Sequence, residues 1–222
     1  DLRLSGHLMG NPSDVEIMVV ADQNAGSLSP VTDYLQKKYP WLKFRILEKN
    51  GHSNGYGSLV RFALAYSTSR YAVLVSPYGE DDITNINKML GSIRAGAQVV
   101  QATRYYLPED STMIRRMFRI YERTYTFLIY LITRKKISDC TYGYKMFDRV
   151  FIQALGLTQN GRSISPEITL KGILAGGKIE FISSSLMSKE IGYKFKLYRD
   201  GFGYFWLLIR CIMHRIKIIL WF

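Results

Sequence analysis

Three consecutive carboxylates, Glu80, Asp81 and Asp82, follow a short apolar run in this chain of 222 residues. The run, residues 71–75, is typical of a buried β-strand, and the Pro and Gly of residues 76–79 end it. In an open α/β sheet, ligands bind outside the carboxyl ends of the strands. Carboxylate oxygens there suit Mg²⁺ or Mn²⁺, ions that commonly accompany a phosphate-bearing substrate. The alternative is a solvated acidic turn that caps the following helix.

The charge of the chain is concentrated in its second half. Residues 1–102 carry 10 Lys+Arg and 9 Asp+Glu, whereas residues 103–222 carry 20 and 9, which accounts for most of the net charge of +12. A basic surface attracts phosphorylated substrates, nucleic acid or an anionic membrane. No pattern of a nucleic-acid-binding module is present, so nucleic acid is not an expected partner. Two distant cysteines indicate neither a disulfide framework nor a metal site, which predicts a reducing compartment.

Apolar periodicity predicts strands that alternate with helices. The expected strands are residues 15–20, 44–47, 71–75, 97–102 and 178–182. This alternation predicts an α/β fold with a mostly parallel sheet flanked by helices. Residues 111–133 predict a long amphipathic helix, and the apolar residues expected on one of its faces are Met117, Ile120, Tyr121, Tyr125, Leu128 and Ile132.

The C-terminal residues predict a second amphipathic helix, over 201–222, after a domain that spans 1–200. Four basic residues interrupt its apolar sequence, too many for a helix that crosses a bilayer. Trp206 and Trp221 beside these cations suit a lipid headgroup boundary, so we expect peripheral attachment at the cytoplasmic face of a membrane. The alternatives are a helix docked on the core and one that binds a second copy of the chain.

Seven short stretches of the sequence occur in the order of motifs in a known enzyme family. They are residues 16–27, 54–58, 71–75, 102–105, 137–147, 166–180 and 189–194. In this order they resemble family 2 glycosyltransferases of the GT-A type, and most of all the polyprenyl (dolichyl) phosphate sugar synthases. The resemblance implies a GT-A fold and a hexosyltransferase activity. The donor would be a UDP- or GDP-linked sugar and the acceptor a polyprenyl phosphate or another membrane-associated glycan, with inversion at the sugar.

The resemblance also implies roles for individual residues. Asp22, Gly55, Gly57 and Arg104 match positions that bind the donor, and the alternative for Asp22 is an ordinary turn residue. A hydroxyl acceptor would need a base, for which Asp139 and Glu167 are the candidates; Asp139 could instead pair with Lys145 or a backbone amide. A phosphate acceptor would need cations instead. The candidates, beside Arg104, are Arg115, Arg116, Lys145, Lys189 and Lys194, of which Arg115 and Arg116 could also be a solvated helix face.

Two departures from the family pattern qualify this expectation. The usual Asp-x-Asp metal motif falls on Ser76 and Tyr78, so a Mg²⁺ or Mn²⁺ ion would have to move to residues 80–82 or be lost. The family's first strand has no counterpart before Val15. Either the chain lacks this strand, which would leave a sheet edge open, or the sequence begins after it, and we expect the second. These departures motivate the alternative function, a catalytically inactive relative that acts as a partner or scaffold subunit.

Overall fold

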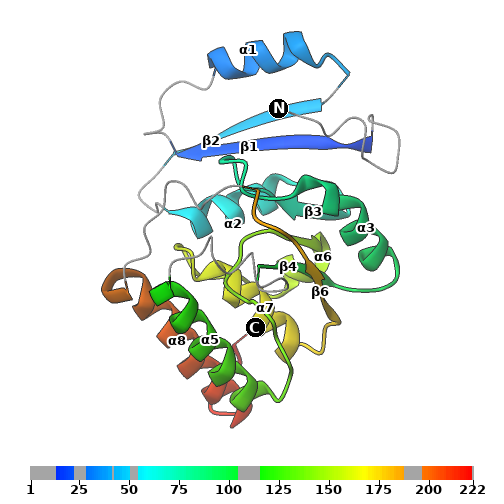
Figure 1. The fold of residues 1–222 in the computed structure, drawn as a ribbon. Helices are drawn as coiled ribbons and strands as arrows, with labels where there is room; N and C mark the ends of the chain where they lie inside the picture. The colour runs from blue at the N-terminus through cyan, green and yellow to red at the C-terminus, as the bar shows by residue number, and fades with distance from the viewer. Residues whose placement is uncertain are drawn as a thin grey trace.

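The computed structural model describes residues 14–22, 29–41, 43–50, 55–104, 116–187 and 197–221. It has an α/β architecture in which helices flank two β-sheets (Figure 1). The strands are β1 (Glu16–Asp22), β2 (Lys43–Lys49), β3 (Tyr71–Leu74), β4 (Val99–Thr103), β5 (Lys145–Asp148) and β6 (Ile179–Ser183). The helices are α1 (Ser29–Lys38), α2 (Tyr56–Tyr66), the 3-10 turn η4 (Ile83–Asn85), α3 (Ile86–Arg94), α5 (Arg116–Thr133), α6 (Arg149–Ala154), α7 (Ile164–Leu174) and α8 (Leu197–Arg215).

The two sheets differ in size and in strand direction. β1 and β2 form a parallel pair, and the larger sheet has the order β3-β5-β4-β6. Within the larger sheet β4 and β6 are parallel, whereas β5 is antiparallel to both β3 and β4. Among the described strands, β1 pairs only with β2, and β3 pairs only with β5. The residues of β1 and β3 are half-buried, while those of β4 are fully buried.

Strand β5 is absent from the sequence-based expectation, and it makes the larger sheet mixed rather than mostly parallel. Its first residue, Lys145, is of a type that is almost never fully buried without a partner. Here the Lys145 ammonium group is buried because it donates to the carbonyls of Cys140 (3.2 Å) and Ser165 (2.6 Å) and to the Thr169 hydroxyl (2.8 Å). These partners come from elsewhere in the chain, so local sequence preference could not predict the strand.

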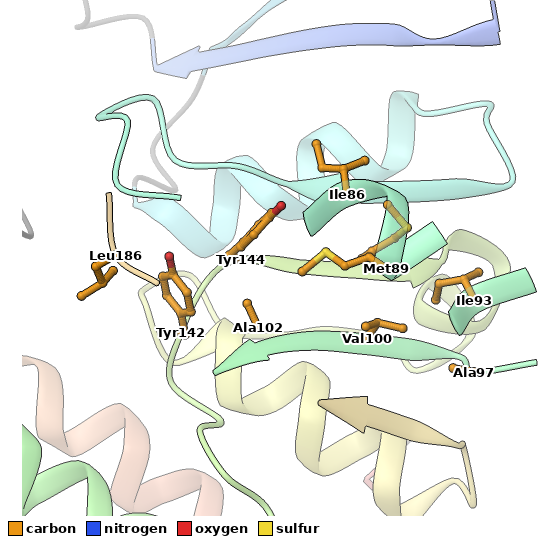
Figure 2. Close-up of a cluster of buried hydrophobic side chains, with 10 residues drawn as sticks. Ile86, Met89, Ile93, Ala97, Val100, Ala102, Tyr142, Tyr144 and Leu186 are labelled. Carbon is orange, nitrogen blue, oxygen red and sulfur yellow. The ribbon is translucent and has the colours of Figure 1, made fainter. Parts of the chain in front are cut away.

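Helices cover both faces of the larger sheet. One buried cluster places Met89 and Ile93 of α3 against Val100 and Ala102 of β4 (Figure 2). A second cluster packs α2, α6 and α7 around Phe147 of β5. Helices therefore pack on both faces of the larger sheet, and this packing restrains the strands whose ends form the sheet edge.

Helices α5 and α8 form a third cluster, at the end of the molecule opposite β1 and β2 (Figure 1). Tyr125 and Ile129 of α5 are buried with Tyr204 and Leu207 of α8, and the Tyr125 hydroxyl donates to the Tyr204 carbonyl. The C-terminal helix is thus docked on the core along one side, and it begins at Leu197. Within the part of the chain that the structure describes, no helix is both long and apolar enough to cross a bilayer.

The apolar residues predicted to share one face of α5 are only partly buried. Tyr121, Tyr125 and Ile132 turn toward the core, but three other residues of that set are exposed. The exposed residues are Met117, Ile120 and Leu128. The apolar arc of α5 is wider than the surface that α8 and the core cover, so half of it faces outward.

Candidate functional site

The candidate site lies where several segments leave one edge of the larger sheet. Leu74, at the end of β3, lies opposite Lys145, at the start of β5, and Thr103 of β4 lies opposite Ser183 of β6. The segments that follow or precede these residues are 75–82, 104, 137–144 and 184–187, so all four meet at this edge. Backbone hydrogen bonds join them: the Met187 amide donates to the Glu80 carbonyl at 3.0 Å. This is the edge where open α/β sheets bind ligands.

A buried ion pair occupies the centre of this edge. The Arg104 guanidinium, at the end of β4, donates to both carboxylate oxygens of Asp139, at 2.8 and 3.2 Å. Asp139 also accepts from the backbone amides of Thr141 and Tyr142. Both members of the pair are almost completely buried. Arg104 and Asp139 are predicted separately from the sequence as site residues, and the structure shows that they are partners in one ion pair.

The electrostatics of Asp139 follow from this pairing. Burial acts to raise the pKa of its carboxyl group, but the Arg104 charge and the hydrogen bonds from Arg104 and Thr141 act more strongly together. The net pKa of Asp139 therefore lies below its usual value, and the group is a carboxylate at neutral pH. A buried carboxylate held by a bidentate guanidinium favours the structural alternative for Asp139, with Arg104 as its partner instead of Lys145.

Two tyrosines connect the acidic turn to this ion pair. The Tyr142 hydroxyl donates to a carboxylate oxygen of Asp81, and the Tyr142 ring lies 4.7 Å from the Arg104 guanidinium carbon. The Tyr144 hydroxyl donates to the backbone carbonyl of Asp82 at 2.9 Å. Both phenol oxygens lie on the side of their rings that faces away from β4 (Figure 2). Burial and the Asp81 charge raise the pKa of Tyr142 and of Tyr144, so both stay protonated donors.

Two of the three carboxylates of the acidic turn, those of Asp81 and Asp82, hold different parts of the local structure. Asp81 is buried and also accepts from the Ser76 amide at 2.6 Å. Asp82 caps η4, because it accepts from the amide and hydroxyl of Thr84 and from the Asn85 side chain. Among the residues that the structure describes, no three acidic, His or Cys side chains are grouped to hold a metal ion. Asp82 is thus the helix cap of the alternative hypothesis, and these residues as arranged do not fit a three-carboxylate metal site.

Glu167 fixes a neighbouring loop. It lies in the first turn of α7, is completely buried, and forms an ion pair with Lys171 at 3.3 Å. Its two oxygens also accept from the amides of Thr158 and Gln159 and from the Thr158 hydroxyl. All of these contacts hold the loop before α7 in place, and this arrangement favours a structural role for Glu167.

The two predicted glycines meet that same loop. A Cβ on Gly57 would lie 2.4 Å from the Gln159 carbonyl oxygen, and one on Gly55 would lie 2.7 Å from the Asn160 carbonyl oxygen. Gly55 also has a φ of +121°, which side chains disfavour. Both glycines therefore permit close approach between the start of α2 and the loop. The predicted role of this stretch in donor binding stays a prediction.

The loop borders a hollow of about 410 Å³ beside the start of α8. Its lining includes Arg162, Ser163, Gly203 and Tyr204. The hollow is linked to the sheet edge through α7, because the Ser165 hydroxyl donates to the Tyr142 carbonyl at 2.6 Å. One basic residue, Arg162, lines it together with polar residues, a composition suited to an anionic group. Arg162 is not among the site residues predicted from the sequence.

The remaining predicted residues are scattered. Asp22 ends β1 on the smaller sheet, opposite Lys49. Arg116 is exposed at the start of α5, and Lys145 is in the core. Arg115, Lys189 and Lys194 lie outside the described residues. The acceptor-binding role of Lys145 has no accessible surface to support it.

Sequence reasoning missed the two tyrosines and Lys171. The only local signal for Tyr142 and Tyr144 was their position on either side of Gly143, which is too weak to assign a role. Lys171 is four residues after Glu167, and an i,i+4 pair on a helix is a readable signal. Its burial, however, depends on carbonyls of Leu155 and Gly156 that only the fold brings near.

Comparisons with known proteins agree on one family and one fold. A family model described as glycosyl transferase family 2 matches residues 4–156. Solved structures of Mycobacterium tuberculosis glucosyl-3-phosphoglycerate synthase share the fold. Its complex with Mn²⁺, UDP-glucose and phosphoglyceric acid has a TM-score of 0.58 at 11% identity, covering 91% of this chain and 79% of that one. Its complex with Mn²⁺ and UDP-glucose has a TM-score of 0.57 at 11% identity, covering 90% and 78%. Among curated protein sequences there is no significant match.

Proposed function

Because this chain belongs to glycosyl transferase family 2, we propose that it transfers a sugar from a UDP- or GDP-linked donor to an acceptor that carries a phosphate, with inversion at the sugar. The acceptor that the sequence favours is a polyprenyl phosphate. The family and the fold support the donor class, and the acceptor class rests on the state of the two candidate bases.

The observation that carries the choice of acceptor is the burial of Asp139 and Glu167. A hydroxyl acceptor needs a carboxylate within reach to take its proton. Both carboxylates are completely buried, and each is engaged by a cation and by backbone amides. A phosphate acceptor is already an anion and needs no such base. The described site therefore suits a phosphate acceptor better than a hydroxyl acceptor.

The reaction balances without a proton transfer on the enzyme. An oxygen of the acceptor phosphate attacks the anomeric carbon of the sugar, and the bond from that carbon to the nucleoside diphosphate breaks. The leaving diphosphate takes the bonding electron pair, and attack from the opposite face inverts the configuration. What the enzyme must supply is orientation and positive charge near both phosphates.

A solved structure of the same fold holds an anionic compound together with a sugar nucleotide. Glucosyl-3-phosphoglycerate synthase has been crystallised with phosphoglyceric acid together with UDP-glucose and Mn²⁺, and phosphoglyceric acid carries a phosphate. In this chain the hollow beside Arg162 is the candidate location for such a group. It adjoins the start of α8.

A divalent metal, when bound in this fold, would neutralise charge on the leaving diphosphate. The carboxylates of Asp81 and Asp82 are engaged by Tyr142, Ser76, Thr84 and Asn85, so we derive no step through a metal at these residues. The residues on which the proposal depends are those that form the edge of the sheet and the hollow.

Donor binding is tested by isothermal titration of the full chain with UDP and with GDP, each with and without Mn²⁺. We expect one of the two nucleotides to bind. Binding of neither would overturn the proposal and support the inactive-partner alternative. The same titrations show whether Mn²⁺ strengthens binding.

The acceptor class is tested with a radiolabelled donor and two matched lipids, a polyprenyl phosphate and the corresponding polyprenol. We expect label transfer to the phosphate alone. In Arg162→Gln we expect the KM for the polyprenyl phosphate to rise about tenfold, the size of one lost charge-assisted contact, with kcat little changed. Arg94→Gln on α3 is the control and should match the wild type. Transfer to the polyprenol at a comparable rate would exclude the base-free reaction.

A further inference from the structure

The outer surface of α5 is apolar, the reverse of an ordinary surface helix. Met117 is 77% exposed and Phe127 is 58% exposed. Ile120, Leu128 and Leu131 are also exposed, and the spacing of these residues places them along one side of the helix. The opposite side of α5 already packs on the core through Tyr125 and Ile129. The exposed apolar side of α5 is therefore separate from the side that packs on the core.

Helix α8 presents the same kind of surface beside it. Its inner side is buried, whereas Phe202 is 71% exposed and Phe205 and Trp206 are also exposed. The two helices lie side by side (Figure 1) and pack through Tyr121, Tyr125 and Tyr204. After α8, Ile216, Ile218 and Leu220 continue the exposed apolar residues to the end of the described chain. We call the outward side of α5, α8 and residues 216–220 the α5–α8 surface.

The charges around this surface are almost all positive. Residues 116–136 contain six Lys or Arg and one acidic residue, Glu122, which is buried. Residues 197–221 contain four Lys or Arg and one acidic residue, Asp200. Aromatic and aliphatic side chains bordered mostly by cations are characteristic of helices that lie in an anionic lipid interface.

A hollow of about 450 Å³ beside α5 combines both features. Phe127, Tyr130 and Ile137 supply apolar walls, and Arg123 and Lys136 supply positive charge. Glu122 also lines it, but its carboxylate accepts a hydrogen bond from the Thr126 hydroxyl at 2.7 Å. A lipid with an anionic headgroup and a hydrocarbon chain matches this pairing of charge and apolar area.

We propose that the α5–α8 surface docks on an anionic lipid bilayer and holds the protein on it as a peripheral protein. Charge decides between this occupant and a second copy of the chain. Two copies meeting through this surface would oppose one excess of cations to another, because residues 116–136 and 197–221 hold ten Lys or Arg against two acidic residues, of which Glu122 is buried. An anionic bilayer provides both the negative charge and the apolar layer that Phe127 and Phe202 can enter.

The test is co-sedimentation of the full chain with two kinds of vesicle, phosphatidylcholine alone and phosphatidylcholine mixed with phosphatidylglycerol. We expect binding to the mixed vesicles, weakened by added salt. Two double variants each address one feature: Phe127→Ser/Phe202→Ser removes apolar area, and Arg134→Glu/Lys135→Glu reverses charge. Each should weaken the partition coefficient about tenfold or more.

Matched controls keep the result specific to this surface. Trp41→Ser removes an aromatic side chain that is 51% exposed after α1, and Lys88→Glu/Arg94→Glu makes the same charge change on α3. Both should bind vesicles like the wild type, and circular dichroism confirms that every variant is folded. Equal binding to phosphatidylcholine alone, or equal loss in the controls, would overturn the proposal. Concentration-dependent self-association in ultracentrifugation, abolished by Phe127→Ser/Phe202→Ser, would show that a second copy covers the surface. The vesicle assay contains neither a sugar donor nor an acceptor, so a failure to bind vesicles would not count against the proposed sugar transfer.

Discussion

Buried charges hold the candidate site together at the scale of single residues. Arg104 and Asp139 pair at the centre of the sheet edge, and Glu167 pairs with Lys171 beneath the neighbouring loop. Lys145 is buried with carbonyl and hydroxyl partners only. Removing one member of a buried pair leaves an uncompensated charge, which costs far more than the pair itself contributes. These residues therefore give the clearest stability predictions.

Replacement of Asp139 tests the pairing with Arg104. Asp139→Asn keeps the shape but leaves the buried guanidinium uncompensated, so we expect the free energy of unfolding to fall by roughly 3–5 kcal/mol. The double variant Arg104→Met/Asp139→Leu removes both charges and should recover part of that loss. Urea unfolding followed by circular dichroism measures both. If the single variant lost less than the double variant, the pair would not be the source of the stability.

The lowered pKa of the buried Lys145 should make the stability of the protein depend on pH. Burial lowers its pKa to about 7, against 10.5 for the ordinary side chain. Between these values the unfolded chain holds a proton that the folded chain has released, so the contribution of Lys145 to stability rises with pH by about 1.4 kcal/mol per unit. Below pH 7 both states are protonated and the contribution is constant.

The measurement compares urea unfolding of the wild type and Lys145→Met from pH 6 to pH 9. Above pH 7 we expect the wild type to gain stability relative to the variant. Parallel curves for the two proteins over this range would show that Lys145 keeps its proton in the folded state.

At the scale of elements, the start of α2 and the loop before α7 form one unit. The Ser58 amide donates to the Asn160 carbonyl at 3.1 Å, and the Arg61 guanidinium donates to the Thr158 carbonyl and the Asn160 side chain. Gly57 makes this contact possible, because the loop backbone occupies the space that a side chain would need. The loop in turn borders the hollow with Arg162, so packing here controls the shape of the site.

Gly57→Ala tests this close approach. The new Cβ would lie 2.4 Å from the backbone oxygen of Gln159, so the loop must move and the free energy of unfolding should fall by about 2 kcal/mol or more. Gly91→Ala, in helix α3, is the matched control, since nothing lies within 4 Å of its Cβ. It should leave stability unchanged or raise it by up to about 1 kcal/mol through better helix propensity. Thermal unfolding compares the two, and equal effects would argue against the contact.

At the scale of the whole molecule, the two sheets have unequal support. The four-stranded sheet has helices on both faces, and β4 is buried along its length. The pair β1–β2 is half-buried, and each strand has one paired edge among the described residues. A two-stranded sheet has little independent stability, so opening of this part should require less free energy than opening of the core.

Hydrogen exchange measured by mass spectrometry tests this difference. We expect amides of β1 and β2 to exchange faster than those of β4 by about tenfold or more, since each 1.4 kcal/mol of opening free energy changes protection tenfold. If UDP or GDP binds near Asp22, the nucleotide should slow exchange in β1 more than in β4. Equal protection of β1 and β4 without nucleotide would show that the two sheets unfold as one unit.

The sequence by itself determined the family and most of the elements. Five of the six strands within the described residues are predicted near their observed positions, because apolar runs bounded by Gly, Pro and polar residues are local signals. The motif order identified the glycosyltransferase family, which the family model confirms. It also brought Asp139, Arg104 and the acidic turn forward as candidates.

Tertiary structure alone decided what those side chains contact. Asp139 pairs with Arg104, Asp81 with Tyr142, and Lys145 with carbonyls up to twenty residues away. A carboxylate available for chemistry and one locked in a buried ion pair have the same residue type and the same neighbours in sequence. The difference is set by desolvation and by partners that meet only when the strands come together at one edge of the sheet. For the same reason, the fold also decided which apolar residues of α5 stay exposed.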